Sequence, residues 1–299
     1  MSAFFGELGG LAASVFWAIS STLFTLGGRR QSHQAVNSIR LLGATVMLAV
    51  SHMFLLGTIL PDESLYVYLM LGLSGVIGLA LGDGLLMWAH VTIGPRLSML
   101  IMSMVPIVTT TVAWFLLNET IEPLKIVAIL VTVGGVSWVV LERNRNKTMF
   151  KVTVFGILLG VGGMLGQAIQ LLIAKGAMDQ MTGSNPALSA TYIRILWGTG
   201  AIWLVSLNRY RMRKTLDAFK DRRFMTLTML GTTVGPFLGV WASYVAIEYA
   251  PIGIASTLMA LAPLFMIPTS YLVFKERPTL RAIIGTSIAL AGVGAIFIL

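Results

Sequence analysis

The sequence predicts an all-α integral membrane protein in which ten transmembrane helices form two inverted five-helix repeats. Three observations predict this fold class. The 299 residues are 56% hydrophobic and only 11% charged, with a mean hydropathy of +0.85, whereas about a quarter of the residues in an ordinary soluble domain are charged. Apolar segments long enough to cross a bilayer recur along the chain, and its two halves share a pattern of residues.

Ten segments approach the roughly 20 apolar residues that a helix needs to cross the hydrocarbon core. The segments are continuous apolar runs rather than alternating ones, which excludes a membrane β-barrel. In order along the chain they cover residues 6–26, 36–56, 65–89, 94–117, 123–141, 153–174, 187–207, 224–247, 252–274 and 280–298.

Basic residues follow the odd-numbered segments and fix the expected orientation. They are Arg29 and Arg30, Arg96, and those within 143–151, 209–223 and 275–281. These loops hold 17 of the 21 Lys and Arg residues, so the positive-inside rule places them in the cytoplasm and both termini outside. We expect a multi-pass protein of the inner or plasma membrane. Because topology alone explains the net charge of +9, we expect no nucleic-acid partner.

The two halves of the chain carry the same landmarks. Residues 104–119 align with 261–276, and Arg40 aligns with Arg194 at an offset of 154. The pairs at an offset of 157 are Pro106 and Pro263, Glu119 and Glu276, Gly78 and Gly235, and Gly82 and Gly239. Because five is odd, the second repeat enters the membrane in the opposite orientation, as in many secondary transporters that bind substrate between their repeats. We expect repeats at 1–142 and 153–299, joined by a basic linker at 143–152.

Each half contains a longer motif that resembles a known family. The two motifs are GLALGDGLLMWAHVTIGPRLSMLIMSMVPIVTTTVAWFLLNETI (78–121) and GPFLGVWASYVAIEYAPIGIASTLMALAPLFMIPTSYLVFKERP (235–278). They are similar to the EamA type of the drug/metabolite transporter superfamily. The resemblance implies a ten-helix carrier that moves small metabolites, often outward, without ATP. Typical members of that family have a basic N-terminus and both ends inside, whereas MSAFFGELGG is not basic and predicts both ends outside.

Asp83 is the first candidate functional residue, because no other Lys, Arg, Asp or Glu lies between residues 65 and 95. A charge at the bilayer centre costs about 2.5–3.5 kcal/mol, so it needs a partner or a purpose. Arg40 lies about 6 Å from the cytoplasmic end of the second segment, and Asp83 lies about 9 Å from the cytoplasmic end of the third. We expect them to meet, either as a structural ion pair or as a proton or cation site.

Other polar side chains within the segments are candidate ligands for substrate. Arg194 has no carboxylate at its depth in its own repeat. It either snorkels outward or receives a substrate carboxylate or phosphate. Gln167 and Gln170 are three residues apart, so they share one helix face and must find partners in the protein interior. These amides either bind substrate or bridge helices.

Aromatic residues are candidates for the wall of a substrate cavity. Phe237, Trp241, Tyr244 and Glu248 follow one another at helical spacing and form a single face. That face either packs in the core or lines the cavity, and the same two interpretations apply to Trp17, Ser20 and Trp88.

Pro106 and Pro263 lie near the middle of the fourth and ninth segments, where each removes a backbone hydrogen bond and kinks its helix. The paired kinks serve either as hinges for alternating access or as static bends. The rows of small residues at 74, 78 and 82 and at 231, 235 and 239 predict close helix packing. Glu119 and Glu276 are expected to be either interfacial residues or caps, and the basic loop at 208–223 predicts a surface helix on anionic lipid.

The sequence favours a secondary carrier, in the export direction, for small metabolites such as amino acids or related amphipathic compounds. Its expected partners are a small-molecule substrate, membrane lipid and protons as the candidate coupling ion, and we expect a monomer. No Cys, P-loop motif or clustered His is present, so no cofactor, metal site or ATP site is expected. The alternatives are a membrane enzyme using Asp83 and His90, and a structural membrane protein.

Overall fold

The computed structural model describes residues 2–117, 119–142, 153–207, 209–274 and 279–298, and within these ranges every regular element is a helix. The linker at 143–152 and Glu276 lie outside the described residues. The elements are α1 (Ser2–Gly28), α2 (His33–Leu56), α3 (Leu65–Gly75), η1 (Val76–Gly82), α4 (Asp83–Met102), α5 (Val105–Leu116), α6 (Pro123–Glu142), α7 (Val154–Met178), α8 (Pro186–Val205), α9 (Arg209–Ala218), α10 (Arg222–Thr232), η2 (Thr233–Gly239), α11 (Val240–Tyr249), α12 (Ile252–Met259), α13 (Ala262–Phe274) and α14 (Leu280–Ile298).

The predicted membrane spans are present in this set of helices. In the described part of the chain, nine helices are long and apolar enough to cross a membrane. A shorter apolar helix, Leu100–Leu116, takes the place of the fourth predicted segment. The all-α membrane fold that the sequence predicts is therefore confirmed.

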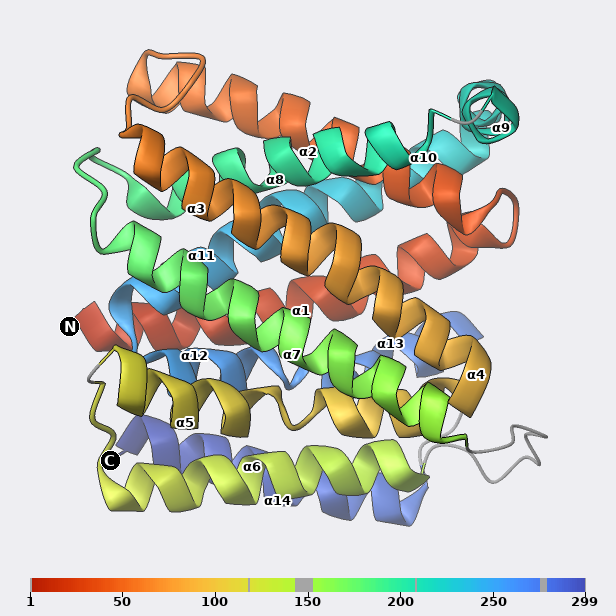
Figure 1. Cartoon of the computed structure of the whole chain (residues 1–299). Helices are drawn as coiled ribbons and strands as arrows, with labels where there is room; N and C mark the ends of the chain where they lie inside the picture. Colours follow the sequence, from red (N-terminus) through yellow and green to blue (C-terminus); the bar gives the residue numbers. More distant parts are fainter. Residues whose placement is uncertain (1, 118, 143–152, 208, 275–278, 299) are drawn as a thin grey trace.

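The chain reverses direction within α4, although its backbone is helical throughout. A Cβ atom placed on Gly160 of α7 would lie 2.8 Å from Cδ1 of Ile101 and 3.8 Å from Cβ of Ala89. A straight helix would hold residues 89 and 101 about 18 Å apart. The two predicted segments, 65–89 and 94–117, are therefore separate spans, and Figure 1 shows the end of α4 turning back towards α5.

Two π-helical segments, which the sequence did not predict, interrupt the third and eighth spans. The segment η1 joins α3 to α4, and η2 joins α10 to α11. The bounds of η2 are those of η1 shifted by 157 residues, so each repeat carries the same irregularity at the same place. Single π turns inside α-helices are rare and frequently accompany functional sites.

The predicted proline kinks are complete breaks in the helices. The helix α4 ends at Met102 and α12 ends at Met259, each four residues before a proline, Pro106 or Pro263. A proline ring clashes with the carbonyl four residues earlier and cannot donate a hydrogen bond to it, so the helix ends there. New helices, α5 and α13, begin one residue before each proline.

Contacts at glycines show the same packing in both repeats. A Cβ atom on Gly10 of α1 would meet Cβ of Leu258 at 2.9 Å, and one on Gly160 of α7 would meet Ile101 at 2.8 Å. The two glycines are 150 residues apart, and their two neighbours are 157 apart. The helix α7 therefore occupies in the second repeat the place of α1 in the first, and both need glycine because neighbouring side chains approach closely.

The repeats meet along the antiparallel helices α2 and α8. Thr45 Oγ1 lies 2.8 Å from Thr199 Oγ1, and these two residues are 154 apart, which is the offset between the two helices. Towards the two ends of the pair, Gln34 Nε2 donates to Ser206 Oγ at 3.0 Å and His52 Nε2 lies 3.2 Å from Ser189 Oγ. The axis that relates the inverted repeats thus passes between Thr45 and Thr199.

The two ends of the bundle differ in charge. In Figure 1 both chain termini lie at the end opposite to α9. At the end of the termini, here called the acidic end, Glu119 Oε2 accepts from the Ile252 backbone N–H at 2.8 Å and Glu248 Oε2 accepts from the Ala187 N–H at 3.1 Å. Glu119 therefore caps α12, as predicted. The end that carries Arg29, Arg30 and α9 is called the basic end.

Candidate functional site

Arg40 of α2 and Asp83 of α4 form the ion pair that the sequence predicts. Arg40 Nη2 donates to Asp83 Oδ2 at 3.3 Å, and Arg40 Nε donates to Asn37 Oδ1 at 2.7 Å. The guanidinium carbon also lies 5.5 Å from the centre of the Phe24 ring. The side chains of Arg40 and Asp83 are 24% and 29% exposed, so the pair is partly buried.

A chain of hydrogen bonds extends from Asp83 into α7 and α3. Gln167 Nε2 donates to Asp83 Oδ1 at 2.9 Å, and Gln170 Nε2 donates to Gln167 Oε1 at 3.3 Å. Ser74 Oγ donates to the Gln170 backbone carbonyl at 2.8 Å. We call Asn37, Arg40, Asp83, Gln167, Gln170 and Ser74 the polar line. It satisfies groups that lipid could not satisfy, and it joins helices α2, α3, α4 and α7.

Arg194 of α8 lies beside the polar line and is 5% exposed. A Cβ atom on Gly78 of η1 would lie 2.5 Å from Arg194 Nη2 and 2.9 Å from Gln170 Cγ. Only glycine at this position leaves room for the guanidinium and the amide to approach each other. On its other side the guanidinium carbon is 5.5 Å from the centre of the Tyr244 ring.

Arg194 and Tyr244 each have one buried side-chain atom without a hydrogen-bond partner. Arg194 Nε and the Tyr244 hydroxyl are both buried and have no hydrogen-bond partner. None of the ion pairs in the described residues includes Arg194. Buried donors are nearly always paired, and an unpaired one costs about 1–3 kcal/mol. This pair of side chains is therefore the best-supported place for a polar group of a ligand.

An aromatic cluster lies next to Tyr244 on η2, α11 and α1. The rings of Phe237 and Trp241 are 6.2 Å apart, and both pack against the main core. Trp17 reaches η2 from α1, since its Nε1 would lie 3.0 Å from a Cβ atom on Gly239. The structure thus brings Trp17, Trp241 and Tyr244 to neighbouring elements, beside an arginine.

Three predicted candidates do not join this group. The Trp88 side chain is 56% exposed, and its ring packs edge-on against Phe155 at 5.5 Å, so it lies on the outside of the bundle. Glu248, on the predicted aromatic face, is used as the cap of α8. The side chain of His90, named for the enzyme alternative, lies outside the described residues.

The proline-linked breaks lie apart from the polar line. Thr109 of α5 and Ser256 of α12 are joined by a 2.7 Å hydrogen bond between their hydroxyl groups, which links the two broken spans to each other. The candidate hinges at Pro106 and Pro263 therefore belong to a second, central contact between the repeats. A hinge function for these two residues stays a prediction.

Asn37 and Ser74 take part in the polar line, although sequence reasoning did not identify them as site residues. Asn37 precedes Arg40 by three residues, a spacing that places them on one helix face and could have indicated their contact. Ser74 was expected only to allow close packing. No residue pattern indicated the π-helical segments, which bring Gly78 to Arg194.

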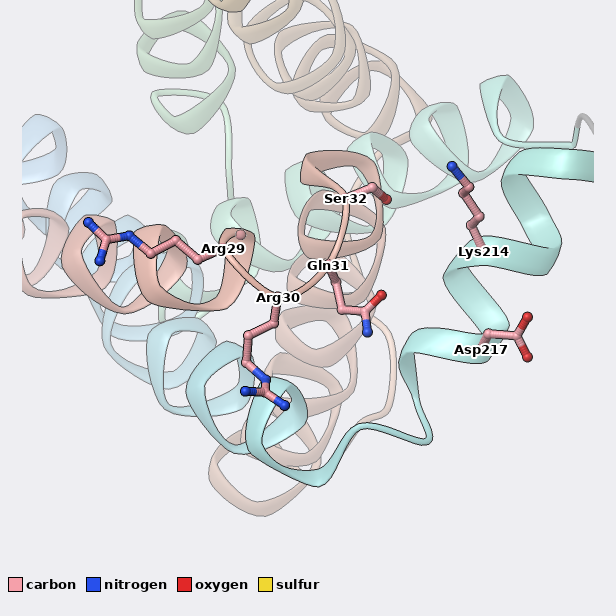
Figure 2. Close-up of a pocket in the computed structure, with 7 residues that line it drawn as sticks. Arg29, Arg30, Gln31, Ser32, Lys214 and Asp217 are labelled. Carbon is pink, nitrogen blue, oxygen red and sulfur yellow. The ribbon is translucent and has the colours of Figure 1, made fainter.

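A surface pocket of about 310 Å³ lies at the basic end, away from the polar line. Figure 2 shows its lining residues on the α1–α2 connection and on α9, with Arg29, Arg30 and Lys214 directed away from one another. Arg30 Nε pairs with Asp221 at 3.0 Å. The Asp221 carboxylate also accepts from the Phe224 N–H, and these contacts hold the pKa of Asp221 below its usual value. The pocket is a surface feature of the loop helix that the sequence predicts.

Comparisons with known proteins agree with this architecture. A family model described as the EamA-like transporter family matches residues 4–141 and 154–298. A solved structure titled "Crystal structure of protein" aligns with a TM-score of 0.77 over 98% of this chain and 96% of its own, at 14% sequence identity, which shows a shared fold alone. Comparison with curated proteins gives no significant match.

Proposed function

Because the chain belongs to the EamA-like transporter family and is therefore a membrane transporter, we propose that it is a secondary carrier that exports small metabolites such as amino acids or related amphipathic compounds. Alternating access between the two inverted repeats would move the substrate past a site near the middle of the bundle. The absence of a P-loop motif in the sequence favours a carrier over a pump driven by ATP.

The observation that carries this proposal is the buried Arg194 beside the polar line. A scaffold protein gains nothing from an unpaired arginine Nε and an unpaired tyrosine hydroxyl in its core, because both cost free energy. A carrier needs donors that remain available when substrate is absent. The aromatic cluster next to Tyr244 supplies apolar surface for the rest of an amphipathic substrate.

Asp83 is proposed as the coupling site, with a proton as the coupling ion. Its side chain is partly exposed, and its carboxylate connects the charged Arg40 to the amides of α7. The competing interpretation is a structural pair that only fastens α2 to α4. Both interpretations place Asp83 in contact with Arg40, so only a functional measurement separates them.

The test is flux into liposomes that contain the purified chain. We expect saturable uptake or exchange of a metabolite, measured first with a mixture of labelled amino acids and then with single compounds. Absence of flux for every compound, together with turnover of one of them in detergent, would favour the membrane-enzyme alternative. Because the sequence contains no cysteine, single introduced cysteines at residues 62 and 217 would show which end faces outside; labelling of residue 62 from outside is expected.

A further inference from the structure

The balance of charges inside the bundle limits what the substrate can be. Three ionisable side chains meet along the polar line and beside it: Arg40, Asp83 and Arg194. Two are cationic and one is anionic, which leaves one positive charge uncompensated. Charges within a membrane are costly unless they are paired. The remaining charge is located at Arg194, because Arg40 and Asp83 neutralise each other.

Ionisable groups elsewhere on the surrounding helices interact with other residues; Glu7 of α1, which is buried, interacts electrostatically with Lys125. His52 contacts Thr58 and Ser189, Glu248 caps α8, and Lys175 pairs with Asp179 at 3.6 Å. These groups lie towards the acidic end of the bundle. Among the described carboxylates, Asp83 also interacts electrostatically with Arg194, but its hydrogen bond goes to Arg40. Arg194 therefore has no ion pair of its own in the part of the chain that the structure describes.

The repeat itself shows which partners Arg194 lacks. Arg40 is bound by Asn37 and Asp83. The residue that corresponds to Asn37 in the second repeat is Thr191, whose hydroxyl donates instead to the Ala187 carbonyl at 2.7 Å. The residue that corresponds to Asp83 is Val240, which has no polar group. The second arginine is thus kept in the fold while both of its partners are replaced.

The chemistry around Arg194 fits one carboxylate better than a larger anion. A guanidinium binds a carboxylate in a planar, charge-assisted geometry, and the Tyr244 hydroxyl can donate a further hydrogen bond. Only one cation is unpaired, so a dianion would bring an unmatched negative charge into the bundle. A zwitterion would bring an ammonium group, and the described polar line holds no carboxylate that is free of Arg40.

We propose that the substrate of this carrier has one net negative charge, as a monocarboxylate with an apolar or aromatic body, and that Arg194 and Tyr244 bind its carboxylate. This inference rests on the proposed transport function and narrows its substrate class. Trp17, Trp241 and Phe237 provide the surface for the apolar body. Neutral amino acids become poor substrates, whereas carboxylates that lack a free ammonium group become good ones.

Three probes that share a phenyl-ethyl frame test the charge directly. They are hydrocinnamate with charge −1, phenylalanine with net charge zero and phenethylamine with charge +1. Binding to the purified full-length chain in nanodiscs is measured by calorimetry and by thermal shift. We expect hydrocinnamate to bind at least about tenfold more tightly than phenylalanine, and phenethylamine not to bind. Equal binding of the three probes, or no binding of hydrocinnamate, overturns the proposal.

Two variants and one control connect the preference to Arg194. Arg194→Gln is expected to remove the preference for hydrocinnamate, and Arg194→Lys, which keeps the charge, is expected to retain part of it. Arg213→Gln on α9 removes the same charge from an exposed position and is expected to change nothing. A preference that survives in folded Arg194→Gln contradicts the inference. Flux of zwitterions that does not depend on Arg194 would contradict it while leaving the carrier function intact.

Discussion

The two repeats share one backbone plan and differ in their chemistry. Where η1 packs against α7, Gly78 and Gly82 face Gln170 and Gln167. In the equivalent place, Gly235 and Gly239 of η2 face Ser20 and Trp17 of α1. The equivalent residues are 150 or 157 apart, which are the offsets of their helices.

This comparison separates what the fold needs from what the function needs. Features present in both repeats include the π-helical segments, the breaks before Pro106 and Pro263, and the glycine contacts. They belong to the scaffold and to its movement. Features without an equivalent at the matching positions of the other repeat include Asp83, the glutamine pair and the aromatic cluster. We propose that these features bind the substrate and couple its transport. Arg40 and Arg194 are the exception, since both repeats keep the arginine and only the first keeps its partners.

The largest expected effect comes from filling the space at Gly78. In Gly78→Leu the new side chain meets Arg194 Nη2 and Gln170, so flux should be lost and the free energy of unfolding should fall by about 1–3 kcal/mol. Flux assays and thermal melts measure the two effects. Gly84→Leu is the control, because a Cβ atom there meets nothing within 4 Å. Equal loss in both variants would show that η1 and α4 tolerate no side chain for reasons unrelated to Arg194.

Asp83→Asn tests whether the Asp83 carboxylate couples transport to protons. The amide keeps a group that can bond to Gln167 but leaves Arg40 without its counterion, so we expect a loss of stability of about 1–2 kcal/mol. If Asp83 is the coupling site, flux driven by a pH gradient disappears while exchange at equal pH continues. Parallel loss of both activities would identify Asp83 and Arg40 as a structural pair.

Pro106→Ala and Pro263→Ala test whether the shared breaks move. Alanine restores a backbone donor and removes the clash with the carbonyls of Met102 and Met259, so both breaks should straighten. If the breaks are hinges, each variant should melt at or above the wild-type temperature while its flux rate falls several-fold. Unchanged flux in both variants would mean that the breaks are static bends.

The smallest effect is expected at Glu119, the cap of α12. Burial raises the pKa of Glu119 above 4.5, while the Ile252 N–H and Lys175 oppose this shift. A raised pKa in the folded state adds stability below the ordinary pKa, and this contribution is lost as the pH rises through the raised value. Glu119→Gln keeps an acceptor for Ile252 without the buried charge.

The Glu119→Gln variant should therefore melt slightly higher than wild type at neutral pH, by under about 1 kcal/mol, and this gain should shrink in acid. Melting curves across pH measure it, and Glu122→Gln at a neighbouring exposed site is the control. A gain that grows as the pH falls would have the wrong sign for this explanation.

Much of the fold could be predicted because a bilayer imposes simple rules on sequence. Span length, the breaks before Pro106 and Pro263, and the contact of Arg40 with Asp83 all follow from rise per residue and from the cost of buried charge. The outward direction of Trp88 could not be predicted, because apolar residues are spread around α4 and periodicity does not distinguish lipid from core. The π-helical segments depend on tertiary packing around Gly78 and Gly235, for which the sequence carries no local pattern.

Arg194 is available to a ligand because the second repeat lacks the two partners, Asn37 and Asp83, that Arg40 has in the first. The double variant Thr191→Asn and Val240→Asp restores equivalent partners beside Arg194 and tests this inference directly. Its melting temperature and its hydrocinnamate binding and flux are measured in the same preparation. We expect a folded protein that melts at or above the wild-type temperature and neither binds nor transports hydrocinnamate. A folded double variant with unchanged binding and flux would contradict it.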